Sequence, residues 1–497
     1  MNYELDWLKR WSLYAPESVA IEDGDTGLAL TYSNLYRAAS SGARLLQTLG
    51  VGHGDRIAVL AMNELSYVTL FFAAQRLGAI LVPMNYRLTQ REVDHIVTDC
   101  KPKLIVHQPH YSDIVQKTQT VWSSQTILLE TFAEQLQKHE PLPISFAAEP
   151  EDAAMIIYTS GTTGAPKGAV LSHRMLFWNS VNTTLRLNIS QNDCTVIFLP
   201  FFHTGGWNVL TTPFLHRGAK VILLKKFDGD QILQLCESNK ATILFGVPTT
   251  MDMMSRSPLF AKTNLSTLRY AIVGGEPMPI ELIRTWHDKG VPIRQGFGLT
   301  EFGPNVFSLN EQDALRKIGS IGFPNFYSDV RIVNDADQEC QVDEVGELLL
   351  KGPMCMTEYW QNSKATLETL QNGWLHTGDL VRRDPEGYFY VMGRKKDMYK
   401  SGGENVYPPE LEKVLRGLPG IREVAVIGVP DAKWGEVGKA FIVVENNAPL
   451  NETSLLEYCQ KNLAKFKIPK YFRFVPDLPK GDSGKILKRK LNEVYPD

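Results

Sequence analysis

Short apolar runs alternate with amphipathic stretches from the N-terminus to about residue 390. Runs of four to six residues, each followed by Gly or Pro and then by a helical period, are typical of buried strands joined by crossover helices. The chain is therefore predicted to have an α/β fold with largely parallel sheets. The runs of this kind are 56–61, 104–107, 154–158, 196–199, 220–224, 242–245 and 270–273.

The pattern changes at Asp329, where short apolar runs lie close together with Asp, Gly and Pro turns between them. This spacing predicts a smaller antiparallel β-subdomain. A dense polar stretch, Arg394-Lys395-Lys396-Asp397, then precedes about a hundred residues, which is the size of a separate domain. The β-subdomain runs are 330–333, 346–350 and 388–391, and the last part has expected helices at 409–415 and 452–463 and strands at 424–429, 440–444 and 471–475.

The charge of the chain is almost balanced, because 52 basic residues face 55 acidic ones and the net charge is −3. This balance does not support a role in binding nucleic acid or another polyanion. The six cysteines lack metal-ligand or redox spacing, so we expect buried thiols in a reducing, cytoplasmic compartment. The N-terminus lacks the apolar core of a signal peptide.

The most apolar long stretch is 65–84, and Gln75 and Arg76 interrupt it. These side chains would be costly in lipid, so we expect a buried helix followed by a strand over 79–82 and no transmembrane segment. Peripheral contact with a membrane and assembly into a homodimer stay open.

The strongest local signal is the segment Tyr158-Thr-Ser-Gly-Thr-Thr-Gly-Ala-Pro-Lys-Gly168. Its glycines and hydroxyl residues offer free backbone N–H and O–H donors, and its lysine offers a cation, which together suit phosphate oxygens. It is not a Walker loop, because the order of residues differs and Pro166 would block direct entry into a helix. A polar linker is the alternative, but the lysine and the preceding strand favour phosphate binding.

Five further segments follow in order. They are Gly274-Gly-Glu-Pro-Met278, Gln295-Gly-Phe-Gly-Leu-Thr-Glu301, Trp374-Leu-His-Thr-Gly-Asp379, the stretch 393–408 and Pro479-Lys-Gly-Asp-Ser-Gly-Lys485. Together with the glycine-rich loop they resemble the motifs of the adenylate-forming superfamily, which comprises acyl- and aryl-CoA synthetases, nonribosomal-peptide adenylation domains and luciferases. The overall pattern is most similar to fatty-acyl-CoA synthetases.

The resemblance implies a ligase that uses ATP, Mg²⁺ and coenzyme A. A carboxylate must first attack the α-phosphorus of ATP, and two like charges about 4 Å apart repel by roughly 4 kcal/mol at an effective dielectric of about 20. A cation between them stabilises the transition state, and Lys485 on its Gly/Ser turn is the candidate. Thr300 would bond the α-phosphate or the acyl carbonyl, and Glu301 would hold Mg²⁺.

The remaining ATP contacts are implied by the same motifs. For Phe297 plain core packing is the alternative, and for Arg394 an interdomain ion pair. The residues assigned to ATP are Thr159, Ser160, Gly161, Thr162, Thr163, Gly164 and Lys167 at the β- and γ-phosphates, Gly275, Glu276, Gln295, Gly296 and Phe297 on the adenine side, and Asp379 and Arg394 at the ribose.

The segment Phe201-Phe-His-Thr-Gly-Gly-Trp207 is implied to contribute the gate of the acyl pocket, here His203, for which a structural role is the alternative. No acidic residue among the candidate walls could pair with an ammonium group, which argues against an amino acid as substrate. The candidate walls are Trp207, Val247, Met251, Gly274 and Gly298. An apolar acid, expected to be a medium- to long-chain fatty acid, is therefore predicted.

The resemblance also implies a second half-reaction, in which CoA attacks the acyl-adenylate and AMP leaves. The C-terminal domain would rotate about Lys396, giving an N-terminal domain of two sheet-and-helix lobes plus the β-subdomain over 1–394, a hinge at 395–396 and a mobile α+β domain over 397–497. Ser401, Gly402 and Gly403 would then line the CoA tunnel, since backbone can approach a ligand closely where Cβ is absent.

Three other functions stay open. An aryl acid could replace the fatty acid, and a separate carrier protein could replace CoA as the acceptor. A catalytically dead nucleotide-binding protein is a third possibility, although Lys485 would then serve no purpose.

Overall fold

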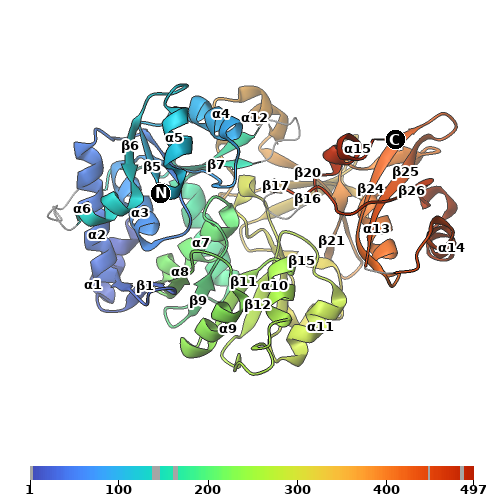
Figure 1. The fold of residues 1–497 in the computed structure, drawn as a ribbon, viewed down its shortest axis with the longest axis horizontal. Helices are drawn as coiled ribbons and strands as arrows, with labels where there is room; N and C mark the ends of the chain where they lie inside the picture. The colour runs from blue at the N-terminus through green and yellow to red at the C-terminus, as the bar shows by residue number, and fades with distance from the viewer. Residues whose placement is uncertain (1–3, 137–145, 160–165, 446–447, 482–485, 497) are drawn as a thin grey trace. The chain divides into compact units, whose positions relative to one another are not determined.

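The computed structural model describes residues 4–136, 146–159, 166–445, 448–481 and 486–496. The chain, which Figure 1 colours by residue number, divides into two compact units. The first unit comprises 1–330 and 350–375, and the second comprises 331–349 and 376–497. Compactness does not identify the peptide about which a domain turns, so the predicted hinge at 395–396 stays a prediction.

One lobe of the first unit is a seven-stranded sheet with the order β18-β8-β7-β4-β3-β5-β6. Its central strands are parallel, as the apolar runs predict, and β8 and β18 add antiparallel strands at one edge. The strands are β3 (Arg56–Leu60), β4 (Ile80–Pro83), β5 (Leu104–His107), β6 (Gln125–Leu128), β7 (Ala153–Thr159), β8 (Lys167–Ser172) and β18 (Glu358–Tyr359), and the connecting helices are α3 (Leu65–Leu77), α4 (Gln90–Cys100), η1 (Pro109–Tyr111), α5 (Ser112–Thr118), α6 (Leu129–Leu136) and α12 (Ser363–Thr369).

The predicted buried helix is α3, in which both Gln75 and Arg76 are buried. Arg76 is tolerated there because its Nη1 bonds Oδ2 of Asp6 at 2.8 Å, so the charge is paired. Gly78 ends the helix in the left-handed conformation, and β4 follows directly. None of the described helices is long and apolar enough to cross a membrane.

The second lobe is built on two further sets of strands. Parallel strands β11, β12 and β13 continue into the antiparallel β14 and β15, and a four-stranded sheet has the order β2-β1-β10-β9. The strands are β1 (Val19–Asp23), β2 (Ala29–Thr31), β9 (Cys194–Ile197), β10 (Lys220–Leu223), β11 (Ile243–Gly246), β12 (Tyr270–Val273), β13 (Ile293–Phe297), β14 (Phe307–Ser308) and β15 (Ser320–Pro324). The helices of the rest of this unit are α1 (Trp7–Tyr14), α2 (Tyr32–Thr48), α7 (His173–Leu187), η2 (Gly205–Val209), α8 (Thr211–Arg217), α9 (Gly229–Ser238), α10 (Pro248–Ser255), α11 (Ile280–Asp288), η3 (Thr300–Phe302) and η4 (Glu311–Asp313).

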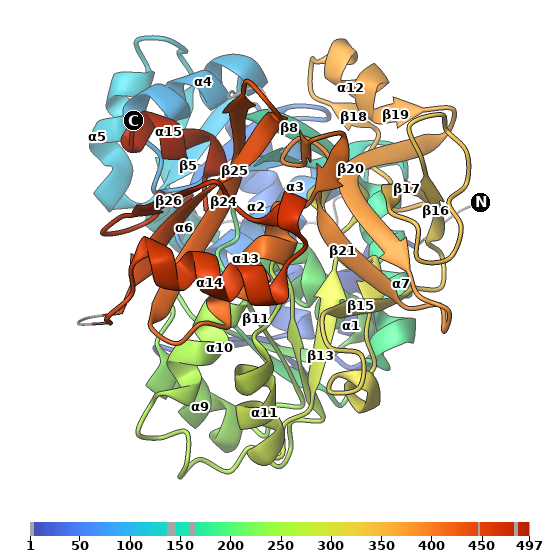
Figure 2. The same ribbon diagram turned by 90° about the vertical axis from the view of Figure 1, so that its right-hand side faces the viewer.

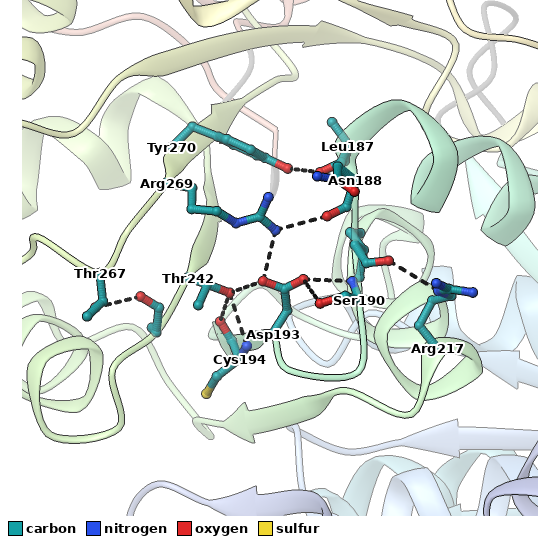
Figure 3. A network of polar contacts seen from close by, with 12 residues as sticks. Leu187, Asn188, Ser190, Asp193, Cys194, Arg217, Thr242, Thr267, Arg269 and Tyr270 are labelled. Carbon is teal, nitrogen blue, oxygen red and sulfur yellow. Dashed lines mark hydrogen bonds and ion pairs between the residues drawn. The ribbon is translucent and has the colours of Figure 1, made fainter.

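A buried carboxylate ties together the starts of three of these strands (Figure 3). Asp193, which precedes β9, is 5% exposed, and its Oδ1 accepts from Thr242 Oγ1 at 2.7 Å and from Arg269 Nη2 at 2.8 Å. Its Oδ2 accepts from the backbone N–H of Ser190 at 2.7 Å and from the Ser190 hydroxyl at 3.1 Å. Thr242 and Arg269 immediately precede β11 and β12, so one side chain links the amino ends of β9, β11 and β12.

The second unit contains the β-subdomain and the C-terminal sheet. The β-subdomain strands have the order β21-β20-β17-β16, and the C-terminal sheet has the order β23-β22-β25-β24 with β26 beside β25. The elements are β16 (Asp329–Val333), β17 (Gly346–Lys351), β20 (Trp374–Arg383), β21 (Phe389–Arg394), β22 (Tyr399–Ser401), β23 (Glu404–Val406), α13 (Pro408–Arg416), β24 (Ile421–Asp431), β25 (Gly435–Val444), α14 (Glu452–Asn462), η5 (Lys465–Lys467), β26 (Tyr471–Phe474), η6 (Lys488–Lys490) and α15 (Leu491–Val494). The short strand β19 (Leu370–Gln371) lies in the first unit. Helices α13 and α14 cover one face of the C-terminal sheet (Figure 2), where Leu411, Leu415 and Leu455 enter its core.

These elements confirm the predicted fold class, with a large α/β part, a small β-subdomain and an α+β C-terminal part. The strands expected at 104–107 and 270–273 have the expected bounds. The strand expected at 196–199 begins two residues earlier, at Cys194, and ends at Ile197 before the turn at Pro200.

Candidate active site

The carboxyl ends of β11, β12 and β13 lie side by side, because Gly246 pairs with Val273 and Val273 pairs with Gln295. Ligands of open parallel sheets bind at this edge. The residues that follow the strands therefore meet there, and a Cβ built on Gly275 would lie 3.6 Å from Cγ1 of Val247. The predicted adenine-side and acyl-side segments thus share one edge of one sheet.

The glycine-rich segment joins two antiparallel strands, β7 and β8, and does not lead into a helix. Thr159 and Lys167 pair across the base of this hairpin, with the Thr159 hydroxyl 3.5 Å from the Lys167 carbonyl. Ser160, Gly161, Thr162, Thr163 and Gly164 lie outside the described residues. The prediction that this is not a Walker loop agrees with the strand that follows it.

Glu301 lies in the single turn of η3, beside the base of the hairpin. Its Oε1 accepts a hydrogen bond from the Tyr359 hydroxyl at 2.8 Å, and the Thr159 hydroxyl lies 3.4 Å from the same oxygen. Its carbonyl accepts from the N–H of Met356 at 2.8 Å. Thr300, which opens the same turn, is half-buried.

Tyr359 also faces Lys167, whose Nζ lies 5.3 Å from the centre of the tyrosine ring. This distance is in the range of a cation–π contact. Sequence reasoning missed Tyr359, because the two-residue strand β18 that carries it is too short to show a period. The residues Thr159, Lys167, Glu301 and Tyr359 therefore form one cluster, which we call the hydroxyl–carboxylate cluster.

This cluster fits the Mg²⁺ that the sequence predicts. Within the described ranges no group of three or more His, Cys, Asp or Glu is placed to hold a metal. Magnesium is usually held by one or two carboxylates together with substrate phosphates and water. Glu301 would supply such a carboxylate oxygen.

The loop that carries Thr300 and Glu301 closes tightly on itself. A Cβ on Gly298 would lie 1.9 Å from the carbonyl oxygen of Pro304, so no side chain fits there without a backbone shift. Gly303 has φ +65° and faces Asn179. The observed contact of Gly298 is thus closure of this loop, and its role as a pocket wall stays a prediction.

The predicted acyl side centres on a residue that sequence reasoning missed, Phe245 at the end of β11. Cβ atoms built on Gly205 and on Gly274 would both lie 3.6 Å from its ring. Gly205 opens η2, one turn of π-helix, which is a distortion found frequently at functional sites. His203, two residues earlier, is half-buried, with its ring centre 4.4 Å from that of Phe202.

Two of the predicted pocket walls are fully buried. Trp207 is 0% exposed and stacks on Phe201 with ring centres 4.0 Å apart, and Tyr67 and Phe71 pack around it. Met251 is also 0% exposed, on the buried face of α10, and donates its backbone N–H to the Val247 carbonyl. Val247 itself is half-buried. Wall roles for Trp207 and Met251 stay predictions.

The remaining adenine-side residues differ in their surroundings. Gln295 is buried and Gly296 pairs with Ser308 of β14. Phe297 is half-buried and meets Phe307 edge to face, with ring centres 5.9 Å apart. Glu276 is exposed on the loop after β12.

The two predicted ribose ligands face each other within the second unit. Asp379 on β20 pairs in register with Arg394 on β21, and Arg394 Nη1 lies 2.7 Å from Asp379 Oδ1. The side chain of Arg394 is 41% exposed. The ion pair of Arg394 thus joins two strands of one unit and is not the interdomain ion pair considered as the alternative, and its ribose role stays a prediction.

The predicted hinge is a tight turn. The N–H groups of Asp397 and Met398 both donate to the Arg394 carbonyl, so Lys395 and Lys396 are its central residues. Lys395 is anchored, since its Nζ lies 3.1 Å from Glu347, and this pairing raises its pKa although burial opposes the rise. Lys396 is exposed, and its N–H is not a donor in either of the two hydrogen bonds to the Arg394 carbonyl that close the turn.

The predicted CoA segment is a two-residue hairpin turn between β22 and β23. Gly402 and Gly403 have φ values of +61° and +89°, which is the turn type that glycine favours. Ser401 is buried. A Cβ on Gly402 would meet the ring of Trp434 at 2.9 Å, and this indole is 45% exposed. Lys485 lies outside the described residues, and Lys480 and Ile486 form a β-bridge on either side of its loop.

Comparison with known proteins places this site in a family. Residues 8–360 match the model of the AMP-binding enzyme family, and residues 410–485 match its C-terminal domain. The chain belongs to the AMP-binding enzyme family, and within it to the adenylate-forming acid:CoA ligases. The resemblance drawn from the sequence is thereby confirmed, and its ATP, Mg²⁺ and CoA agree with this membership.

Several relatives are similar over nearly the whole chain. A feruloyl-CoA synthase of Amycolatopsis sp is 38% identical over 98% of both chains. The long-chain-fatty-acid–CoA ligase FadD13 of Mycobacterium tuberculosis is 35% identical over 98% of this chain and 97% of its own. The structure of Bacillus subtilis o-succinylbenzoate CoA synthetase with ATP and magnesium ion is 31% identical, has a TM-score of 0.89 and covers 98% of this chain and 99% of its own.

Proposed function

We propose that this chain is an AMP-forming acid:CoA ligase for an apolar carboxylic acid, in the first instance a medium- to long-chain fatty acid. The observation that carries the proposal is the surface around Phe245, where Gly205 and Gly274 approach the ring without side chains of their own. The residues assigned to this pocket carry no charge, so an amino acid would leave its ammonium group buried and unpaired. Each buried methylene of an aliphatic chain would instead contribute about 0.8 kcal/mol.

In the first half-reaction the hydroxyl–carboxylate cluster would hold the triphosphate. Lys167 and the hairpin above it would bind the β- and γ-phosphates, and Glu301 would hold the metal. When bound, Mg²⁺ neutralises charge on the phosphate oxygens. Thr300 and Lys485 would stabilise the oxygens around the α-phosphorus as the carboxylate attacks and pyrophosphate leaves.

In the second half-reaction the CoA thiol would attack the adenylate carbonyl, and AMP would leave. Asp379 and Arg394 would keep the ribose in place, and a rotation about Lys396 would bring Ser401, Gly402 and Gly403 to the pantetheine. The exposed indole of Trp434 beside Gly402 offers a face for the nucleotide part of CoA. Glycine at both turn positions would let backbone approach the pantetheine closely.

An aryl acid is the second candidate. Phe245 favours it, because a flat aromatic acid can pack on an aromatic ring, and relatives named feruloyl-CoA synthase and indoleacetate–CoA ligase lie beside the fatty-acid ligase.

The test is CoA-dependent AMP release with saturated acids from C2 to C18, benzoate, cinnamate and ferulate. For a fatty acid, kcat/KM should climb from acetate and level off or fall where the pocket ends. A flat profile from C4 to C16 with high turnover of cinnamate or ferulate would establish the aryl reading. Better turnover of a small amino acid than of octanoate would overturn both.

Two controls separate the remaining alternatives. Thioester formation with CoA alone, without any carrier protein, would show that CoA is the acceptor. Release of pyrophosphate when a carboxylic acid is added would rule out a protein that only binds the nucleotide.

A further inference from the structure

Tyr359 stands between the two charged members of the hydroxyl–carboxylate cluster. Strand β18 pairs with β8, with Tyr359 opposite Ala169, two residues beyond Lys167. The tyrosine residue is 8% exposed, so most of it is buried. This pairing continues one residue further, where the Trp360 N–H donates to the Gly168 carbonyl at 2.7 Å, so the backbone of Tyr359 is held against β8.

The hydrogen bonds to Glu301 distinguish its two carboxylate oxygens. Oε1 accepts from Tyr359 at 2.8 Å, and the Thr159 hydroxyl is 3.4 Å away. In the part of the chain that the structure describes, no donor bonds Oε2. A carboxylate that ligates a metal is commonly oriented by hydrogen bonds to its other atoms. Oε2 is therefore the oxygen available to the metal.

The tyrosine ring has a separate partner. The Lys167 ammonium lies 5.3 Å from the ring centre, over its electron-rich face. One side chain thus contacts the expected metal ligand through its hydroxyl and the expected phosphate ligand through its ring. The two contacts can be removed in steps, because phenylalanine removes only the hydroxyl contact and leucine removes both contacts.

We propose that Tyr359 is a positioning residue for MgATP: its hydroxyl fixes Glu301 so that Oε2 binds the metal, and its ring holds Lys167 at the phosphates. This inference rests on the proposed function, in which Glu301 holds Mg²⁺ and Lys167 binds phosphate. It adds that two parts of one side chain have different effects: the hydroxyl affects the affinity for the metal, and the ring affects the affinity for the nucleotide.

The test measures binding without any acid present, so that no turnover occurs. ATP affinity is measured by calorimetry with Mg²⁺ and with EDTA, and Mn²⁺ binding in the presence of ATP is followed by water-proton relaxation. Tyr359→Phe should weaken Mn²⁺ binding about tenfold, the scale of losses when a partner of a metal ligand is removed. Its metal-free ATP affinity should stay within about twofold, because Lys167 keeps its ring. Tyr359→Leu should also weaken metal-free ATP binding.

The matched control is Tyr390→Phe, which deletes a tyrosine hydroxyl that bonds another carboxylate, Asp384, at 3.2 Å. It should leave both affinities unchanged. Thermal melting of each variant reports folding, and Tyr359→Phe, which changes one atom, carries the decision if Tyr359→Leu is unstable.

Glu301→Gln distinguishes a failure of the positioning role of Tyr359 from a failure of the proposed metal site. If Glu301→Gln loses metal binding while Tyr359→Phe retains it within twofold, the positioning role is overturned and the proposed function stands. If Glu301→Gln itself leaves Mn²⁺ binding unchanged, the metal assignment in the proposed function fails, and the role of Tyr359 fails with it. A tenfold loss in Tyr359→Phe together with a larger loss in Glu301→Gln supports both.

Discussion

Gly298 and Gly274 lie at the same edge of the sheet that contains β11, β12 and β13, but they should respond very differently to the same added methyl group. Gly298→Ala places a Cβ 1.9 Å from the Pro304 carbonyl oxygen, whereas real Cβ contacts do not fall below 3.0 Å. Backbone must therefore move by at least about 1 Å. The segment between Gly298 and Pro304 carries Thr300 and Glu301. A misplacement of about 1 Å in such a site can lower the rate about a hundredfold. That loss corresponds to about 2.7 kcal/mol in the barrier.

Gly274→Ala adds the same methyl group with ordinary contacts, 3.6 Å from the Gly296 carbonyl oxygen and from the Phe245 ring. The fold and adenylation of short acids should be retained within about threefold. The added methyl group occupies about the space of one methylene in the proposed pocket. The kcat/KM of the longest acid that the unaltered chain accepts well should therefore fall roughly fourfold relative to that of the acid one carbon shorter. Gly52→Ala, at a half-buried position where nothing lies within 4 Å of an added Cβ, is the neutral control.

The assay is acid-dependent pyrophosphate release across a series of saturated acids, with circular dichroism melts of every variant. Gly298→Ala should lose about a hundredfold with every acid, since the change acts on the phosphate side. Retention of adenylation within threefold by Gly298→Ala would contradict this prediction, and so would an equal loss in Gly274→Ala.

Four further outcomes are expected. Lys485→Ala should abolish adenylate formation and largely spare thioester formation from supplied acyl-adenylate, and equal losses in both half-reactions would contradict its role. Lys396→Pro should spare adenylation and slow the overall reaction steeply, because proline restricts its own φ and the residue before it, and normal acyl-CoA formation would exclude Lys396 as the pivot. Asp193→Asn should lower the free energy of unfolding by about 3 kcal/mol, because Arg269 loses its buried ion-pair partner. Denaturant melts measure this loss, and turnover per folded molecule should stay unchanged. Burial lowers the pKa of His173 to about 4, so below about pH 6.5 the unfolded chain binds a proton that the folded chain does not. The free energy of unfolding should therefore fall between about pH 6.5 and pH 4, and it should fall less steeply in His173→Gln.

Parallel strands such as β5 and β12 could be predicted because they are buried on both faces and read as one apolar run. Strands β5 and β12 are four consecutive buried residues each, and their bounds follow directly from the sequence. Short antiparallel strands carry no such signal. The two residues of β18 form a strand only because β8 provides backbone partners, so the place of Tyr359 beside Glu301 depends on tertiary pairing.

Residue type identifies the chemistry of this site better than it identifies position. Lysine, glutamate and threonine in ordered motifs predict phosphate and metal binding, and the described members Thr159, Lys167 and Glu301 do lie together. Gly274 and Gly298 read alike as glycines in neighbouring motifs, yet only one has room for a methyl group. The difference depends on where the Pro304 backbone returns, which no local pattern encodes.

The identity of the acid is the least predictable feature, because it depends on where an apolar pocket ends. Each methylene contributes only about 0.8 kcal/mol, so one side chain more or less at the far wall moves the preferred length without changing any motif. Aromatic neighbours do not resolve the matter, since a ring such as Phe245 packs against an alkyl chain and an aryl group alike. Relatives named for ferulate and for long-chain fatty acids are 38% and 35% identical to this chain over 98% of its length. In the proposed pocket, selectivity would therefore depend on the shape of a few wall positions, and the contrast between Gly274→Ala and the unaltered chain across the acid series tests whether Gly274 is one of them.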